Sequence, residues 1–185
     1  SFKRMHTDHL DLWQIHNLQK MADVDRLLAR DGALRALQKA KSEGLARFIG
    51  VTGHYEPNVL REMIRRTELD CILMAVNAAD RHYLSFIEHL LPLALEKEMG
   101  IIGMKVATRG RMLSTWKPEP PEQQPERMRT SKPGAITMAE SLAYNFSLPV
   151  STNIVGVDTV AQLEENLKCA ANFVPLSTAQ MQALE

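Results

Sequence analysis

The sequence predicts an α/β fold in which the strands of a parallel sheet alternate with helices. Short apolar runs, each with the length and composition of a buried strand, recur five times along the chain. Each run is followed by a segment whose apolar residues repeat at helical spacing. After the fourth run, a long loop precedes this segment. Regular alternation of this kind is typical of a parallel sheet covered by helices.

The expected elements follow one another in order along the chain. Gly44 is placed to end the first helix, and Pro57 lies in the first turn of the second. A last short helix should begin at Ser177 or Thr178, which are favourable N-cap residues. The strands should cover residues 11–16, 47–52, 71–77, 100–106 and 153–157, and the helices 27–42, 57–66, 86–98, 136–146 and 159–172.

Residues 1–185 are long enough for one domain with a substantial core. A complete barrel of eight strand-helix units needs about 250 residues. About five units and a C-terminal helix therefore predict a partial TIM (β/α)8 barrel. Residues 114–134 are rich in proline, glutamate and glutamine, and we expect a flexible loop on the active-site face. Two interpretations of this loop are left open: a lid over the active site, and an insertion without function.

Composition favours a small neutral partner over a charged polymer. The 22 lysines and arginines balance the 22 aspartates and glutamates, which argues against nucleic acid or an anionic membrane as a partner. No apolar run reaches the roughly 18 residues of a membrane span. Cys71 and Cys169 are expected to be buried thiols in a reducing, cytoplasmic compartment. Ser1 in place of methionine fits a processed, trimmed or partial chain.

Polar side chains stand at the end of each predicted strand. Active sites of parallel barrels are built from these ends and the loops that follow them. A solvated rim is the competing explanation. The polar positions are His16-Asn17, Thr52-Gly53-His54, Asn77, Lys105 with Arg109, and Val157-Asp158-Thr159.

Three motifs in this order resemble the aldo/keto reductase family. Residues 11–16 (DLWQIH) resemble its fourth strand, residues 46–52 (ARFIGVT) its fifth, and residues 154–166 (IVGVDTVAQLEEN) its nucleotide-binding eighth strand and helix. The resemblance covers nearly the whole chain, as strands 4 to 8 of that barrel. It implies an NAD(P)H-dependent oxidoreductase that reduces aldehydes or ketones, as small-molecule substrates, to alcohols.

The resemblance also implies roles for the strand-end residues. His16 matches the catalytic histidine, whose N–H would polarise the substrate carbonyl. Thr52 replaces the serine that bonds the nicotinamide carboxamide, and Gly53 stands where an asparagine is usual. The other implied cofactor positions are Asn77, which ends the sixth strand; Met104, against the nicotinamide ring; and Lys105 and Arg109, which either meet the pyrophosphate or are merely solvated.

The last strand-helix unit should bind adenosine. Members of the family that select the 2'-phosphate usually carry a lysine and an arginine where this chain has Gly156 and Gln162. Neither substitute is charged, which weakens selection for NADP, and the expected cofactor is NADP or NAD. The matching positions are Gly156, Val157, Asp158, Thr159, Gln162, Glu165 and Asn166.

The tyrosine, lysine and aspartate that complete the family's catalytic group lie on its first three strand-helix units. Tyr55 and Tyr83 do not lie in the tyrosine motif. We therefore expect residues 1–185 to be inactive alone, as part of a reductase that lacks its N-terminal barrel half. The alternatives are a non-catalytic nucleotide- or partner-binding module and a metal-dependent barrel hydrolase. The last is disfavoured, with no metal expected, because only His16 and His54 lie near strand ends.

Overall fold

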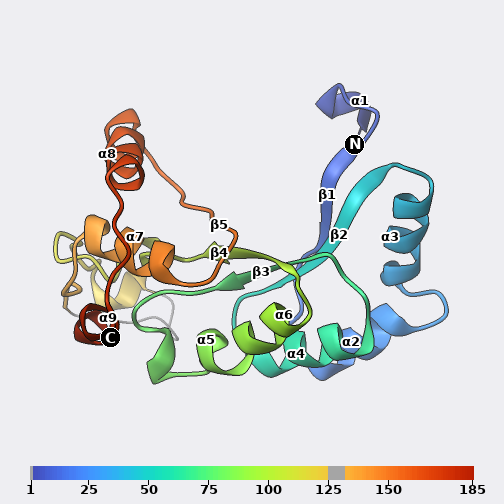
Figure 1. Cartoon of the computed structure of the whole chain (residues 1–185), viewed down its shortest axis with the longest axis horizontal. Coiled ribbons are helices and arrows are strands. Elements are labelled where there is room, and N and C mark those ends of the chain that lie inside the picture. Colours follow the sequence, from blue (N-terminus) through green and yellow to red (C-terminus); the bar gives the residue numbers. More distant parts are fainter. Residues whose placement is uncertain (1, 125–131) are drawn as a thin grey trace. The chain divides into compact units, whose positions relative to one another are not determined.

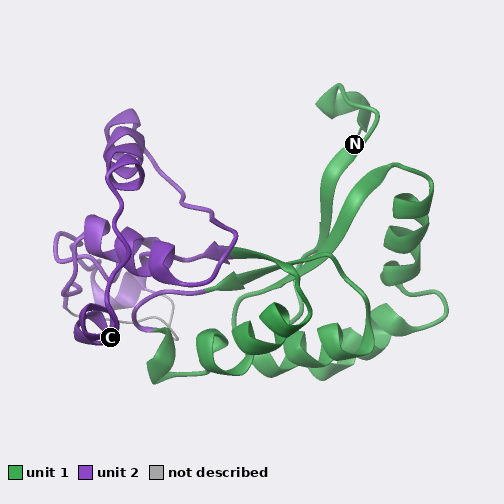
Figure 2. Ribbon diagram, in the orientation of Figure 1, with its two compact units in different colours: residues 1–75, 80–102 green, residues 76–79, 103–185 purple. Residues whose placement is uncertain are grey.

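The computed structural model describes residues 2–124 and 132–185. Contacts divide the chain into two compact units: unit 1 contains residues 1–75 and 80–102, and unit 2 contains residues 76–79 and 103–185 (Figure 2). The strands follow the order β1-β2-β3-β4-β5 in one sheet, so neighbours in sequence are neighbours in the sheet. They are β1 (Leu10–Ile15), β2 (Ala46–Gly53), β3 (Cys71–Ala75), β4 (Gly100–Met104) and β5 (Thr152–Asn153), as Figure 1 shows.

Unit 1 contains the regular part of the predicted alternation. β1 pairs in parallel with β2, where Ile15 lies opposite Val51, and β2 pairs in parallel with β3, where Val51 lies opposite Ile72. Val51 and Ile72 are fully buried, as continuous apolar strands of a covered parallel sheet should be. The helices of this unit are α1 (Phe2–Met5), α2 (Met21–Leu28), α3 (Ala33–Ser42), α4 (Pro57–Arg66), α5 (Phe86–His89) and α6 (Leu91–Glu96).

The prediction of α4 is confirmed at both ends, but the single helix expected over residues 27–42 is wrong. Two helices, α2 and α3, occupy this region, and α2 begins earlier, at Met21. The chain turns extended at Ala29 (ψ 160°), and Gly32 is the N-cap of α3. A side chain at position 32 would collide with the Leu27 carbonyl oxygen. Gly32 therefore permits the close turn that separates the two helices.

The helix expected over residues 86–98 is also two helices, α5 and α6. Pro92 lies in the first turn of α6, where its missing N–H costs nothing, and it cannot continue the hydrogen-bond ladder of α5. Asp80, in a short 3-10 turn (η1, Asp80–His82), and Ser85 form the buried start of α5. The Asp80 carboxylate accepts the Ser85 hydroxyl at 2.6 Å and the backbone N–H groups of Phe86 and Ile87 at 3.1 and 2.9 Å.

Unit 2 contains α7 (Met138–Ser147), α8 (Val160–Ala171) and α9 (Thr178–Leu184), with short 3-10 turns at Thr108–Gly110 and Pro121–Gln123. Asn145 of α7 is fully buried, and its Nδ2 donates to the Val76 carbonyl at 2.8 Å and to Asn153 Oδ1 at 3.2 Å. This amide joins α7 to β5 and to the segment after β3. The N-cap of α9 is Ser177, one of the two residues predicted for this position.

The fifth strand is shorter than predicted. Only Thr152 and Asn153 form β5, and the N–H of Ile154 donates to the Gly103 carbonyl at 2.8 Å before the chain leaves the sheet. Val157 is exposed, so the apolar run 153–157 is not the buried strand that it resembles. Helix α8 contains no buried residue, and Val160 is 72% exposed.

The predicted loop over residues 114–134 includes residues 125–131, which lie outside the described residues. Its two ends are joined, because the Ser114 N–H donates to the Ile136 carbonyl at 2.9 Å. Both cysteines are free, as expected, but neither is buried: Cys71 starts β3, Cys169 lies on α8, and both are half-exposed. Among the described residues, no helix has both the length and the apolar character needed to cross a membrane.

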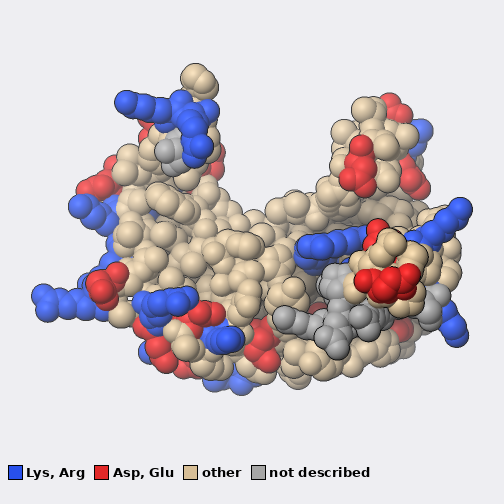
Figure 3. All heavy atoms as spheres, turned by 180° about the vertical axis from the view of Figure 1, so that it is seen from behind, with Lys and Arg blue, Asp and Glu red and all other residues tan. Residues whose placement is uncertain are grey.

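Charges are mixed on the surface of unit 1. On the face seen in Figure 3, lysine and arginine side chains are mixed with aspartate and glutamate side chains. Arg66 of α4, for example, meets Asp25 of α2 at 2.9 Å. This distribution agrees with the equal numbers of acidic and basic residues.

Candidate functional site

Two of the predicted site residues end neighbouring strands of unit 1. His16 follows β1 directly and is exposed, whereas Thr52 lies near the end of β2 and is only 1% exposed. The Thr52 carbonyl accepts the Leu18 N–H at 3.1 Å. The Thr52 hydroxyl Oγ1 is buried and has no hydrogen-bond partner among the described residues. Because unpaired buried hydroxyls are costly, this atom is suited to a partner from outside the described residues.

A second histidine lies beside His16. The Nε2 atoms of His16 and His54 are 3.2 Å apart, and their rings meet edge to face with centroids 5.3 Å apart. His54 follows β2 and is half-buried. The sequence places both residues at strand ends but does not show that they meet. The available signal was that each follows one of two consecutive strands, which a parallel sheet places side by side.

Gly53 stands where the family resemblance places an asparagine, and a side chain at this position would be crowded. An ideal Cβ at Gly53 would lie 2.9 Å from Leu60 Cδ1 and 3.1 Å from the Leu18 carbonyl oxygen. A side chain at this position would therefore require the Leu60 side chain to move and the segment after β1 to shift slightly. The contact to the nicotinamide amide that the family resemblance assigns to asparagine is missing because glycine has no side chain.

The strand ends of unit 2 carry the next group of predicted residues. Asn77 follows β3, and its amide is used locally: Nδ2 donates to the Lys105 carbonyl at 3.2 Å, and Oδ1 accepts the Ala79 N–H at 3.0 Å. Met104 ends β4 and is buried. Asn77 therefore shapes the loop after β4 rather than presenting a free amide.

Two cations follow β4 in a strained loop. Lys105 and Arg109 both adopt left-handed backbone conformations, with φ of 63° and 57°. Partial burial, followed by the nearby positive charge of Arg109, lowers the pKa of the Lys105 amine below its ordinary value. Two cations that repel each other are favourably placed to bind an anionic group, since a phosphate would relieve this repulsion.

The first turn of α8 is capped by side chains of the same segment. Thr159 is the N-cap, and its Oγ1 accepts the Gln162 N–H at 3.2 Å. In return, Gln162 Oε1 accepts the N–H groups of Asp158 at 2.7 Å and Thr159 at 3.3 Å. This reciprocal capping box occupies amides that could otherwise meet a phosphate. The other predicted adenosine residues, Gly156, Val157, Glu165 and Asn166, are exposed except for Asn166, which is half-buried.

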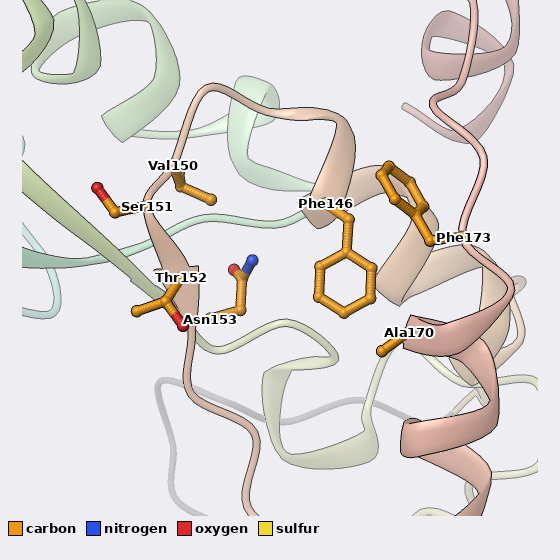
Figure 4. A pocket seen from close by; sticks show the side chains of 7 residues that line it. All are labelled: Phe146, Val150, Ser151, Thr152, Asn153, Ala170 and Phe173. Atoms are coloured by element: carbon orange, nitrogen blue, oxygen red, sulfur yellow. The ribbon is translucent and has the colours of Figure 1, made fainter.

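A cavity of about 370 Å³ in unit 2 lies away from these residues. It is lined by residues of α7, β5 and α8 and of the segments beside them, and Figure 4 shows the rings of Phe146 and Phe173 beside it. These two rings pack edge to face with centroids 5.3 Å apart. The cavity opens beside Ser151 and Thr152, at the amino end of β5. None of the predicted site residues lines it, and ligands of parallel sheets bind at the carboxyl ends of strands.

Comparison with known proteins agrees with the motifs. The family model described as "Aldo/keto reductase family" matches residues 1–185. The chain belongs to the aldo/keto reductase family. It is 25% identical over 206 residues to the uncharacterized oxidoreductase YqkF of Bacillus subtilis, with 100% of this chain and 62% of that protein covered. It is 28% identical over 193 residues to L-galactose dehydrogenase of Arabidopsis thaliana, with 97% and 58% covered.

Solved aldo/keto reductases have the same fold. The holo form of aldo-keto reductase AKR11C1 from Bacillus halodurans matches with a TM-score of 0.75 at 24% identity, covering 99% of this chain and 60% of that one. An aldo-keto reductase from Klebsiella pneumoniae in complex with NADPH matches with a TM-score of 0.66 at 17% identity, covering 99% and 60%. The fold is therefore a partial aldo/keto reductase barrel, and the chain spans about 60% of the length of these relatives.

Proposed function

We propose that this chain supplies the nucleotide-binding part of an NAD(P)H-dependent oxidoreductase that reduces a small aldehyde or ketone to an alcohol. The observation that carries the proposal is the position of His16 and Thr52 at the ends of two adjacent parallel strands. One presents an exposed imidazole, and the other has a buried hydroxyl without a partner among the described residues. An imidazole suits a carbonyl oxygen, and the hydroxyl suits an amide.

In this proposal His16 donates an N–H to the carbonyl oxygen and so stabilises the negative charge that develops there. Thr52 bonds the carboxamide of nicotinamide. The family resemblance assigns Met104 to the face of the nicotinamide ring, and Asn77 holds the loop that follows Met104. Hydride transfer to the carbonyl carbon would come from a reduced nicotinamide held by these residues. The remaining binding residues are Lys105 and Arg109 for the pyrophosphate and, for adenosine, Gly156, Val157, Asp158, Thr159, Gln162, Glu165 and Asn166.

The family's tyrosine acid has no counterpart in its motif among residues 1–185. A polarised carbonyl still needs a proton donor to become an alcohol. We therefore propose that residues 1–185 bind the nucleotide but do not reduce a carbonyl by themselves. A cytoplasmic location is proposed as well, since both cysteines are free and disulfides are rare in that compartment.

The capping box favours a cofactor without a 2'-phosphate. The side-chain oxygen of Gln162 accepts the backbone N–H groups of Asp158 and Thr159, and the side chain carries no positive charge. Asp158 adds an exposed carboxylate to the same segment. A phosphate dianion normally requires a cationic partner, so NADH should bind at least as well as NADPH.

Nucleotide titration tests the proposal. The fluorescence of Trp13 and Trp116 should be quenched by NADH and by NADPH, with saturation and a dissociation constant no weaker for NADH. The control is a titration with Zn²⁺, which should leave both the fluorescence and the thermal midpoint unchanged. Zinc-dependent stabilisation without a response to either nucleotide would overturn the reductase assignment in favour of a metal-dependent enzyme.

A further inference from the structure

The parallel pairing of β1 and β2 places two imidazoles at neighbouring strand ends. Ile15 and Val51 are opposite each other in the register, so the segments that follow both strands leave the sheet side by side. His16 follows Ile15 directly, and His54 follows the last residue of β2. Their Nε2 atoms are 3.2 Å apart, which is hydrogen-bond distance.

Two neutral imidazoles at this distance can share only one proton between the facing nitrogens. One Nε2 must carry the hydrogen and donate it, while the other must offer its lone pair. The tautomer of one ring therefore dictates the tautomer of the other. Among the described residues, the His16 ring has no other hydrogen-bond partner. Of the described side chains, His54 is therefore the one that can fix the proton on His16 through a hydrogen bond.

We propose that His54 is a positioning residue that holds His16 in one tautomer and one orientation. This inference rests on the proposed function, in which His16 donates an N–H to a carbonyl oxygen. A donor needs its proton on a defined nitrogen, and an exposed imidazole in water exchanges between tautomers. His54 is the more buried of the two rings and packs beside Tyr55, with centroids 6.3 Å apart. The buried ring thus anchors the exposed one.

Two variants separate the role of the nitrogen from the role of the ring. His54→Ala removes both, whereas His54→Phe keeps a ring of similar size but has no nitrogen. The tautomer populations of His16 can be read from nitrogen-15 shifts in long-range proton–nitrogen NMR spectra. The spectra should be recorded at about pH 8.5, two units above the ordinary histidine pKa of about 6.5. His16→Gln identifies the His16 signals, and His89→Gln, at an exposed histidine of α5, is the matched control.

We expect His16 to show one dominant tautomer in the wild-type chain and in His89→Gln. In both His54 variants the ratio of its tautomers should change by about fivefold, which corresponds to the ~1 kcal/mol of one hydrogen bond. A wild-type ratio in either variant would overturn the proposal, and retention in His54→Phe alone would show that ring packing suffices. If His54→Phe lacks the dispersed spectrum of a folded protein, His54→Leu replaces it.

The spectra are independent of the nucleotide titration. If NADH and NADPH do not bind but the His16 tautomers respond as expected, the positioning role stands and the reductase function fails. If the nucleotides bind but the tautomers do not respond, the positioning role alone fails.

Discussion

The side-chain oxygen of Gln162 accepts the backbone N–H of Asp158 at 2.7 Å, so the start of α8 is closed by its own capping box. Among the described residues, no cation takes part in this capping box, and the Asp158 carboxylate is exposed beside it. In the proposed function this segment meets the adenosine end of the nucleotide, so the capping residues would also affect the preference between NADH and NADPH.

Gln162→Arg should raise the affinity for NADPH relative to NADH by about tenfold, the equivalent of ~1.4 kcal/mol, because arginine supplies a bidentate cation for the 2'-phosphate. Arginine cannot accept the two N–H bonds, so α8 should lose about 1 kcal/mol of capping. Competitive titration with both nucleotides measures the ratio. The matched control is Gln162→Glu, which keeps the accepting oxygen and should lower the ratio; equal ratios in the two variants would refute this assignment.

Thr52→Val should have opposite effects on stability and on binding. Valine has the shape of threonine without the hydroxyl, and the Thr52 Oγ1 is buried without a partner among the described residues. Its removal should leave the free energy of unfolding unchanged or raise it by up to about 1 kcal/mol. Nucleotide affinity should fall about fivefold to tenfold, as expected for one lost hydrogen bond.

Thr52→Ser is the control for that variant. It keeps the hydroxyl and removes a buried methyl group, so stability should fall by about 1 kcal/mol while nucleotide affinity is retained. Urea denaturation and nucleotide titration measure the two quantities. Loss of stability in the valine variant with unchanged affinity would mean that the hydroxyl serves the fold and not the cofactor.

Asp70 should make the stability of unit 1 depend on pH. Partial burial raises the pKa of this carboxyl, but the hydrogen bonds from Lys41 (2.6 and 2.7 Å) and from the Ile49 N–H (2.8 Å) outweigh burial, so the pKa lies below its ordinary value. A lowered pKa stabilises the fold above the unfolded-state value of about 3.9, and this stabilisation is lost as the pH falls through the folded-state pKa.

Asp70→Asn should therefore cost about 1–2 kcal/mol near pH 7, and the difference from wild type should shrink below about pH 4. Urea denaturation at several pH values between 3 and 7 measures it. Subtracting the free energies of unfolding of the two proteins cancels the contributions of the other carboxyl groups. A difference that is constant over this range would show that the Asp70 charge does not contribute.

Asp80→Ala should destabilise the fold by about 2–4 kcal/mol. The Asp80 carboxylate accepts three donors at the buried start of α5, and alanine would leave the Ser85 hydroxyl and two backbone N–H groups without this acceptor. The matched control is Asp25→Ala, which removes a surface ion pair to Arg66 and should cost less than about 1 kcal/mol. Similar thermal midpoints for the two variants would show that the buried cap is not a major contribution.

Local chemistry explains which elements were predictable. α4 begins at Pro57 and ends at Arg66 as expected, because proline and apolar periodicity act within the helix itself. The break between α2 and α3 was missed because Gly32 looks tolerable inside an apolar helical pattern. Its need for space becomes visible only when the Leu27 carbonyl lies against it. The run 153–157 has strand composition, yet the chain leaves the sheet after Asn153.

The candidate site was likewise predictable from the sequence in part. The motifs and residue types of the sequence are sufficient to predict the family, the order of the strand-helix units and the positions of His16 and Thr52 at strand ends. The packing of the folded chain shows in addition that the Thr52 hydroxyl has no hydrogen-bond partner among the described residues, that a side chain at position 53 would be crowded, and that His54 meets His16. Each of these depends on a distance between atoms that lie far apart in the sequence, and packing of β1, β2 and α4 fixes those distances.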